Sequence, residues 1–177
     1  RNLAISEAVA PFNLYYAPDP SSQIACTIGG NIAENAGGVH CLKYGLTVHN
    51  VLALRVALID GTVAEIGSGA LDSPGYDLLA LMIGSEGTLG FITRAWMRLQ
   101  DRPRFRAAAS VSFTGMPQAA AAVRAISQAG LFPSNCRLLD PLEALVNGVG
   151  NGSTALLVLA FESADHPLQA WMSRALE

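Results

Sequence analysis

A segment rich in glycine and asparagine, residues 27–38 (TIGGNIAENAGG), is the part of the chain best suited to hold a ligand. It contains two Gly-Gly pairs, with Asn31 directly after the first pair and Asn35 shortly before the second. Because glycine lacks a Cβ atom, a ligand can approach the main chain closely, and successive exposed N–H groups form a concave surface suited to phosphate oxygens. The alternative interpretation is a tight loop packed against a neighbouring strand.

Two further segments have the same character. Residues 18–22 (PDPSS) offer hydroxyl groups on a rigid turn, and residues 84–90 (GSEGTLG) repeat glycine at intervals of three. Three such surfaces in one compact domain suit an elongated ligand, for which a dinucleotide is the natural candidate. The order of the motifs argues against a Rossmann fingerprint, and no G-x-x-x-x-G-K-[ST] sequence indicates a P-loop.

No residue is predicted to act as a catalytic base. Glu86 is the carboxylate inside the candidate ligand loop of residues 84–90, and a role in shaping the turn through hydrogen bonds to neighbouring backbone is favoured over proton transfer. The three histidines, His40, His49 and His166, lack the spacing of metal ligands, so no metal site is predicted. Catalytic residues therefore stay unassigned.

Composition limits the class of protein. Of 177 residues, 51% are hydrophobic and 14% are charged, which is typical of a core-rich globular chain with room for contacts to another domain or subunit. The net charge of −3, without a cluster of Lys or Arg, argues against nucleic acid as a partner. The apolar runs are too short to span a bilayer. Three widely spaced cysteines indicate no disulfide framework and favour a reducing, cytoplasmic setting.

The first hundred residues read as short helices followed by a β-hairpin. Helices are expected over 2–10, 31–35 and 77–83, and strands over 14–17, 51–59, 62–66 and 91–99. Asp60-Gly61 is a strong two-residue hairpin signal. The side chains on the two faces of this hairpin are mostly apolar, with only Arg55 charged, so we expect both faces to be covered.

The polar, Pro-containing residues 100–104 (QDRPR) predict a boundary between domains 1–101 and 102–177. After it, strands are expected over 105–113, 135–139 and 155–161, and helices over 117–129, 141–146 and from 167 onward. This alternation predicts an α+β chain whose second part opens a split βαβ layer without its last strand. The chain begins without Met and ends within a helical pattern, so we expect an internal fragment of a longer protein.

The motifs together resemble a known family. Residues 18–22 (PDPSS), 26–45 (CTIGGNIAENAGGVHCLKYG), 75–78 (GYDL) and 83–90 (IGSEGTLG) are similar to those of the FAD-linked oxidases of the vanillyl-alcohol-oxidase type. Within this family the chain resembles the FAD-binding subunits of bacterial glycolate oxidases, with D-lactate and D-2-hydroxyglutarate dehydrogenases as relatives. Residues 135–140 (NCRLLD) and 160–167 (AFESADHP) look like the start of the family's cap domain.

The resemblance implies a fold and a cofactor site. The first region would be the second half of a two-part FAD-binding domain, an antiparallel sheet flanked by helices, and the second would begin a ferredoxin-like cap domain. The cofactor would be FAD. The residues implied to line its cleft are Pro20, Ser21, Gly29, Gly30, Asn31, Asn35, Gly37, Gly38, Tyr44, Gly45, Glu86, Gly87, Gly90, Ile92 and Thr93.

The resemblance also implies an activity. The parent protein would oxidise a 2-hydroxy acid of the glycolate or D-lactate type to the 2-oxo acid, passing a hydride to the flavin, and the fragment by itself would be inactive. A redox-neutral FAD-dependent transferase like the alkyl-glycerone-phosphate synthases, and a structural fragment without catalysis, are the alternatives. Implied partners are the small 2-hydroxy acid and further oxidase subunits, including one for electron transfer, which would place the protein peripherally at the inner face of the membrane.

Overall fold

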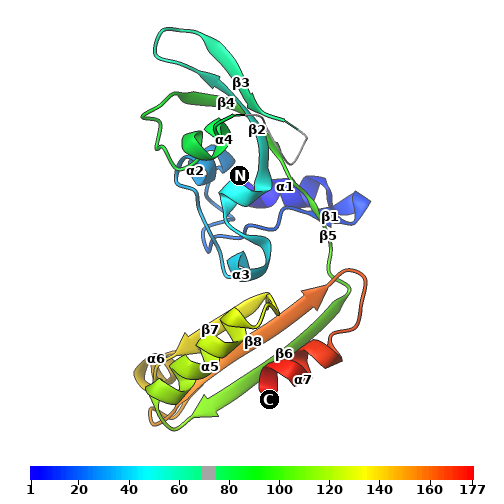
Figure 1. The fold of residues 1–177 in the computed structure, drawn as a ribbon, viewed down its shortest axis with the longest axis vertical. Helices are drawn as coiled ribbons and strands as arrows, with labels where there is room; N and C mark the ends of the chain where they lie inside the picture. The colour runs from blue at the N-terminus through cyan, green and yellow to red at the C-terminus, as the bar shows by residue number, and fades with distance from the viewer. Residues whose placement is uncertain (69–74) are drawn as a thin grey trace. The chain divides into compact units, whose positions relative to one another are not determined.

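The structure, a computed structural model, describes residues 1–68 and 75–177. These residues form two compact units, Arg1–Asp101 and Arg102–Glu177, whose elements are labelled in Figure 1. Each unit combines helices with antiparallel sheets, so the predicted α+β class is confirmed. No helix in the described part of the chain has the length and apolar character needed to cross a membrane.

The first unit is built around a three-stranded antiparallel sheet of order β3-β2-β4. Its strands are β2 (Val51–Ala57), β3 (Val63–Gly67) and β4 (Phe91–Met97). The β2–β3 hairpin turns at the predicted Asp60-Gly61, but the loop is longer than the predicted two residues, because the Leu58 N–H donates to Thr62 O at 2.8 Å and leaves residues 59–61 in the turn. The Asp60 carboxylate accepts a hydrogen bond from the Thr62 N–H at 2.9 Å, and Gly61 has φ +82°. A left-handed residue at this position is the reason that glycine follows aspartate in such turns.

Short elements surround this sheet. Strands β1 (Leu14–Tyr15) and β5 (Gln100–Asp101) pair with each other in a separate two-stranded ladder. The helices of the unit are α1 (Asn2–Ala8), α2 (Ile28–Ala33), α3 (Cys41–Tyr44) and α4 (Leu78–Met82), with 3₁₀ turns η1 (Ala10–Phe12) and η2 (Thr47–Asn50). The strand predicted over 14–17 is therefore shorter than expected.

The core of the first unit lies on one face of the sheet. Leu54 and Val56 are fully buried there with Val51, against Ile32 of α2 and Met82 of α4. Strict alternation would have placed residue 52 on this face. The register between β2 and β4 shifts between Val51 and Ala53, which is a β-bulge, so Val51 enters the core cluster instead.

The expectation that both faces of the hairpin are covered is wrong for the residues described. Ile59 is fully exposed, and Val63 and Phe91 are more than half exposed at the same end of the sheet. On the open face Arg55 of β2 pairs with Glu65 of β3, directly opposite in register. Helices α2 and α4 cover only one face of the sheet. An apolar sequence does not by itself mean that a second layer of structure covers the other face.

Burial of Tyr16 leads to a prediction about pH. The side chain is 2% exposed, and this burial raises the pKa of its phenol from 10 to about 12, with the nearby Thr47 hydroxyl offsetting part of the effect. A raised folded-state pKa contributes stability that is fully present below pH 10 and is lost as the pH rises towards 12. We expect Tyr16→Phe to remove up to about 2 kcal/mol of the fall in unfolding free energy between these pH values. Urea unfolding at a series of pH values measures this difference. The prediction would be contradicted if the unfolding free energies of the wild type and Tyr16→Phe fell equally with pH.

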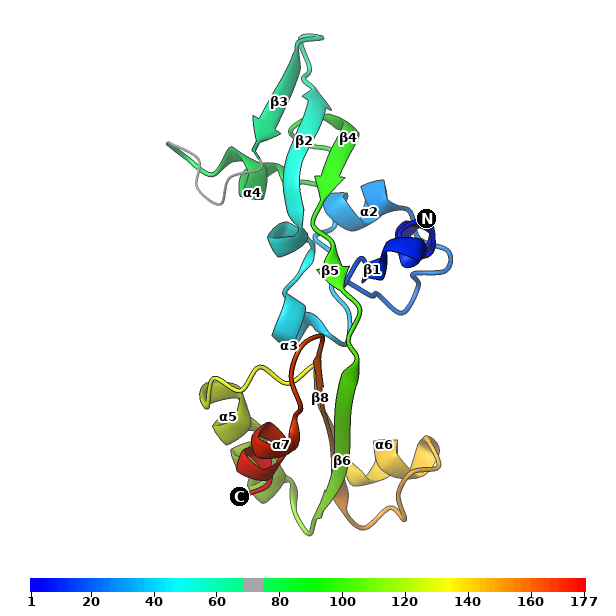
Figure 2. The same cartoon turned by 90° about the vertical axis from the view of Figure 1, so that its right-hand side faces the viewer.

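The second unit is a three-stranded antiparallel sheet of order β6-β8-β7. Its strands are β6 (Phe105–Phe113), β7 (Asn135–Leu139) and β8 (Ala155–Ser163). Helix α5 (Met116–Gln128) connects β6 to β7, and β8 lies between these two strands, which is the split βαβ arrangement predicted from the sequence. Helices α5 and α7 (Gln169–Leu176) lie on one face, and α6 (Pro141–Val146) lies on the other (Figure 2).

The core of this unit follows from alternation along β8. Leu157, Leu159 and Phe161 point to the face covered by α5 and α7, where they pack with Ile126 and Leu168. All five side chains are at most 7% exposed. A single central strand with an apolar residue at every second position thus holds both helices to the sheet.

Helix α6 depends on a side-chain cap. The carboxylate of Asp140, at the N-cap, accepts a hydrogen bond from the Glu143 N–H at 2.8 Å, and Pro141 occupies the first helical position. We expect Asp140→Ala to lower the unfolding free energy of the second unit by about 1 kcal/mol. Chemical denaturation followed by circular dichroism measures this, with Asp140→Asn as a control because an amide oxygen can still accept the hydrogen bond. Equal stability of Asp140→Ala and the wild type would refute the capping role.

Candidate functional site

Residues 27–38 fold into α2 and the loop that follows it. Thr27 is the N-cap of the helix, and its hydroxyl oxygen accepts a hydrogen bond from the Gly30 N–H at 3.0 Å. The helix therefore begins at Ile28, earlier than the turn expected over 31–35. The cap satisfies a donor of the first turn, and packing of Ile32 in the core offsets the low helix propensity of the two glycines.

Most main-chain N–H groups of this segment donate within the protein. The pairs, in chain order, are Gly30 to Thr27 Oγ1, Asn31 to Thr27 O, Glu34 to Gly30 O, Asn35 to Ile32 O, Ala36 to Asn31 O and Gly38 to Cys41 Sγ. In the part of the chain that the structure describes, the N–H groups of Ile28 and Gly29 meet no acceptor. The first turn of α2 therefore carries two main-chain donors without an acceptor.

The glycines of the segment are of two kinds. A Cβ atom added to Gly29 would meet nothing within 4 Å, so this position faces open space. At Gly37 an added Cβ would lie 2.9 Å from Leu46 Cδ2, and at Gly38 it would lie 2.4 Å from Asp19 O. The first glycine pair therefore offers accessible main chain, whereas the second pair allows two parts of the protein to pack closely. The first pair therefore agrees with the interpretation as a ligand loop, and the second pair agrees with the interpretation as a tightly packed loop.

The two asparagines also differ. Asn35 has φ +50°, and its side-chain oxygen accepts a hydrogen bond from the Val48 N–H at 2.9 Å, so it shapes the loop. Asn31 is 3% exposed, and within the described residues its side-chain nitrogen has no hydrogen-bond partner. A buried amide donor without an acceptor is costly, which marks Asn31 as a residue that a ligand could satisfy.

The loop of residues 84–90 packs directly against α2. The Gly84 N–H donates to Ile32 O at 2.9 Å, and the Glu86 N–H donates to Ala33 O at 3.1 Å. Gly84, Glu86 and Gly87 all have positive φ, which bends the loop sharply around the end of the helix. The structure thus brings together two glycine-rich segments that are far apart in the sequence.

Glu86 itself is exposed and contributes to the turn through its backbone. An added Cβ at Gly87 would meet nothing within 4 Å, whereas at Gly90 it would lie 3.0 Å from Ala57 O of the neighbouring strand β2. Ile92 and Thr93 follow on β4, where both contact β2: Ile92 lies opposite Val56, and the Thr93 hydroxyl donates to Arg55 O at 3.0 Å.

Residues 18–22 are connected to the second glycine pair by an ion pair. The Nδ1 atom of His40 lies 2.6 Å from the Oδ2 atom of Asp19. Pro20 is half-buried, and its carbonyl oxygen accepts a hydrogen bond from the Gln23 N–H at 2.8 Å, while Ser21 is exposed. The contact between Asp19 and His40 was not predicted, because neither residue type nor spacing indicates a pairing across 21 positions.

Tyr44 is the last residue of α3, and Gly45 is the C-cap that follows it. The Tyr44 ring packs edge-on against Tyr15 with centroids 6.1 Å apart, and the Lys43 Nζ atom lies 5.2 Å from its centre. Gly45 has φ +76°, and a Cβ there would lie 2.6 Å from the His49 ring. This glycine is therefore required by the backbone conformation and by close packing.

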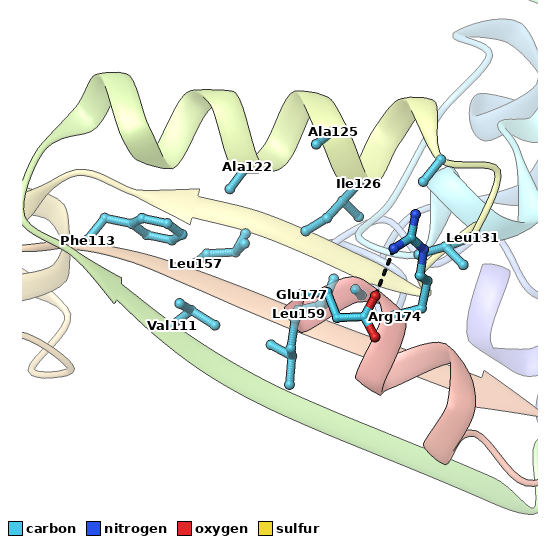
Figure 3. Close-up of a pocket in the computed structure, with 13 residues that line it drawn as sticks. Val111, Phe113, Ala122, Ala125, Ile126, Leu131, Leu157, Leu159, Arg174 and Glu177 are labelled. Atoms are coloured by element: carbon cyan, nitrogen blue, oxygen red, sulfur yellow. Dashed lines mark hydrogen bonds and ion pairs between the residues drawn. The ribbon is translucent and has the colours of Figure 1, made fainter.

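The second unit contains a cavity of about 400 Å³ (Figure 3). It is lined mainly by apolar side chains of α5 and the sheet, among them Ile126, Phe113 and Leu157. At one end Arg174 donates to Glu177 at 2.8 Å. None of the predicted cofactor residues lines this cavity. Among the described residues, no group of three His, Cys, Asp or Glu side chains could hold a metal ion.

Comparisons with known proteins agree with this picture. Residues 1–67 match the family described as FAD binding domain. The chain is 58% identical to the glycolate oxidase subunit GlcD of Escherichia coli (strain K12) over 142 residues, covering 80% of this chain and 28% of that protein. It is 34% identical to a D-lactate dehydrogenase of Archaeoglobus fulgidus over 174 residues, covering 94% of this chain and 39% of the relative.

The fold is also found in solved structures. An alkyldihydroxyacetonephosphate synthase superimposes with a TM-score of 0.83 at 21% sequence identity, covering 99% of this chain and 35% of that one. At this identity the likeness concerns the fold alone. The chain spans 28% to 39% of the length of these three proteins.

Proposed function

Starting from the fact that this chain belongs to the FAD-linked oxidases of the vanillyl-alcohol-oxidase type, we propose that the longer protein oxidises a 2-hydroxy acid to the 2-oxo acid. Identity to a glycolate oxidase subunit and to a D-lactate dehydrogenase supports a substrate of the glycolate or D-lactate type. FAD supplies the redox chemistry when bound, and the protein binds and orients both cofactor and substrate.

The observation that carries the proposal is the junction between α2 and the loop of residues 84–90. Two glycine-rich segments meet there through hydrogen bonds to Ile32 O and Ala33 O, in and beside the region that matches the FAD binding domain family. The residues present fit the cofactor. Gly29 faces open space, and the buried amide nitrogen of Asn31 has no partner among the described residues.

We assign distinct tasks to the residues of this site. Gly29, Gly30 and Asn31, with the free N–H groups at the start of α2, would contact FAD directly. Ser21, Glu86 and Gly87 are exposed and would contact it from the neighbouring loops. The remaining predicted residues would shape the cleft through backbone conformation and packing: Pro20, Asn35, Gly37, Gly38, Tyr44, Gly45, Gly90, Ile92 and Thr93.

The two units would have separate tasks. We propose that residues 1–101 form the C-terminal portion of the FAD-binding domain and that residues 102–177 form part of a cap domain over the substrate. The chain by itself would then be inactive, because it spans 28% of the glycolate oxidase subunit that it resembles. That relative is named as a subunit, which supports further subunits for this protein. We propose that one of them accepts electrons and that the protein is cytoplasmic, or lies at the membrane surface through these subunits.

The proposal is tested on the longer protein. We expect the purified protein to show a flavin absorbance spectrum, and to reduce an artificial electron-accepting dye when glycolate or D-lactate is added. L-lactate serves as the stereochemical control. Absence of a flavin spectrum even after FAD is added would overturn the proposal. Consumption of an acyl-glycerone phosphate without dye reduction would favour the transferase alternative.

A further inference from the structure

Asp19 and His40 join two loops of the first unit. The His40 Nδ1 and Asp19 Oδ2 atoms are 2.6 Å apart, and the other carboxylate oxygen accepts a hydrogen bond from the His40 backbone N–H at 3.4 Å. The carboxylate thus holds both the ring and the backbone of His40. The side chains are 33% and 20% exposed for His40 and Asp19, so solvent screens this pair less than a fully exposed one.

The backbones that carry these side chains are in contact as well. A Cβ atom on Gly38 would lie 2.4 Å from both the carbonyl oxygen and the Oδ1 atom of Asp19. No side chain fits between the two segments at this point. We call this contact, made by Asp19, Gly38 and His40, the Asp19–His40 clamp.

The clamp lies between residues proposed to form the cofactor site. Asp19 directly precedes Pro20 and Ser21, and His40 follows the Gly37-Gly38 pair. Residues 16–20 and 36–38 have no regular secondary structure, so no helix or sheet ladder sets the distance between them. Their relative position depends on side-chain contacts, and the clamp supplies one of them.

We propose that the Asp19–His40 clamp positions residues 18–22 against residues 36–38 and thereby preorganises the FAD site. This inference rests on the proposed function, because it concerns the same site. Asp19 and His40 act here as positioning residues that need not touch the cofactor. A site that is already ordered does not spend binding energy on ordering its loops, so the affinity for FAD rises.

The test uses the full-length protein and measures the dissociation constant of FAD by quenching of flavin fluorescence. We expect Asp19→Ala and His40→Ala each to raise this constant about tenfold, and the double variant to raise it no further than Asp19→Ala, because the contact between the ring and the carboxylate is lost in all three. His40→Asn can still donate to Asp19 from an atom close to the place of Nδ1, and should restore most of the affinity.

Arg55 and Glu65 provide the matched control. They form an ion pair across β2 and β3 of the same unit, on its open face. Arg55→Ala and Glu65→Ala should leave the FAD dissociation constant within about twofold of the wild type, because exposed pairs contribute little. Thermal melting of each apoprotein, recorded separately, shows that binding is compared between folded proteins.

Three outcomes separate the possibilities. If the wild type binds no FAD, the proposed function fails. If the wild type binds FAD and both clamp variants bind it equally well, the clamp has no positioning role and the inference is overturned. Losses of affinity that are equal in the clamp and control variants would overturn it too. If Asp19→Ala does not fold, His40→Ala and His40→Asn decide the matter, because they keep the Asp19 contact with Gly38.

Discussion

Replacing Gly38 with valine is expected to destabilise the first unit by about 3 kcal/mol or more. The added Cβ would lie 2.4 Å from Asp19 O and Asp19 Oδ1, closer than atoms approach without repulsion. The atoms it meets include backbone, so a rotation of one flexible side chain cannot relieve the clash. The two segments would have to separate, which breaks the contact between Asp19 and His40.

Urea unfolding of the full-length protein, followed by a probe specific for the first unit, measures this effect. Gly29→Val is the matched control, since the same substitution in the same glycine-rich segment meets nothing within 4 Å. It should change the unfolding free energy by less than about 0.5 kcal/mol. If Gly38→Val were as stable as Gly29→Val, the close approach of the two segments would be disproved.

Gly29→Val is expected to have the opposite effect to Gly38→Val: the protein stays folded but binds FAD roughly 100-fold more weakly. Gly29 faces open space beside the free N–H groups at the start of α2, and the buried Asn31 amide follows two residues later. A branched side chain there would occupy space in which we propose that the cofactor binds, and would keep it away from the main chain.

The measurement is the FAD dissociation constant of the purified apoprotein, with a melting curve to show that the fold is intact. Gly29→Ala should give an intermediate loss because its side chain is smaller. An unchanged dissociation constant in Gly29→Val would remove Gly29 from the cofactor site. The proposed function would then depend on the loop of residues 84–90 and on Asn31.

Much of the fold follows from local sequence. The turn at Asp60-Gly61, the apolar strand β8 and the helix α6 from Pro141 onward are each predicted by the sequence, because the determining residues are neighbours in the chain. The order of strands in the second unit also follows, since a strand–helix–strand pattern leaves few topologies. The predicted ends of helices and strands were less accurate. At α2, for example, the side-chain cap makes the helix begin before the predicted residue 31.

Predictions from the sequence were wrong where the structure depends on contacts between residues that are distant in the chain. A bulge between β2 and β4 placed Val51 in the core cluster, and no local pattern in β2 reveals a shift that its partner strand imposes. The apolar hairpin suggested cover on both faces, yet Phe91 and Val63 stay largely exposed in the described structure. Hydropathy indicates which residues favour burial but not whether a second layer is present.

By itself, the sequence determined the α+β class, the family resemblance and the motifs of the proposed cofactor site, because these depend on residue types at fixed spacing. Only the tertiary structure decided what each motif residue does. Gly29 and Gly38 are identical in the sequence, but one faces open space and the other packs against Asp19. The difference arises because the role of a glycine depends on the atoms that surround it. Contacts such as that between Asp19 and His40 form only when distant segments fold together.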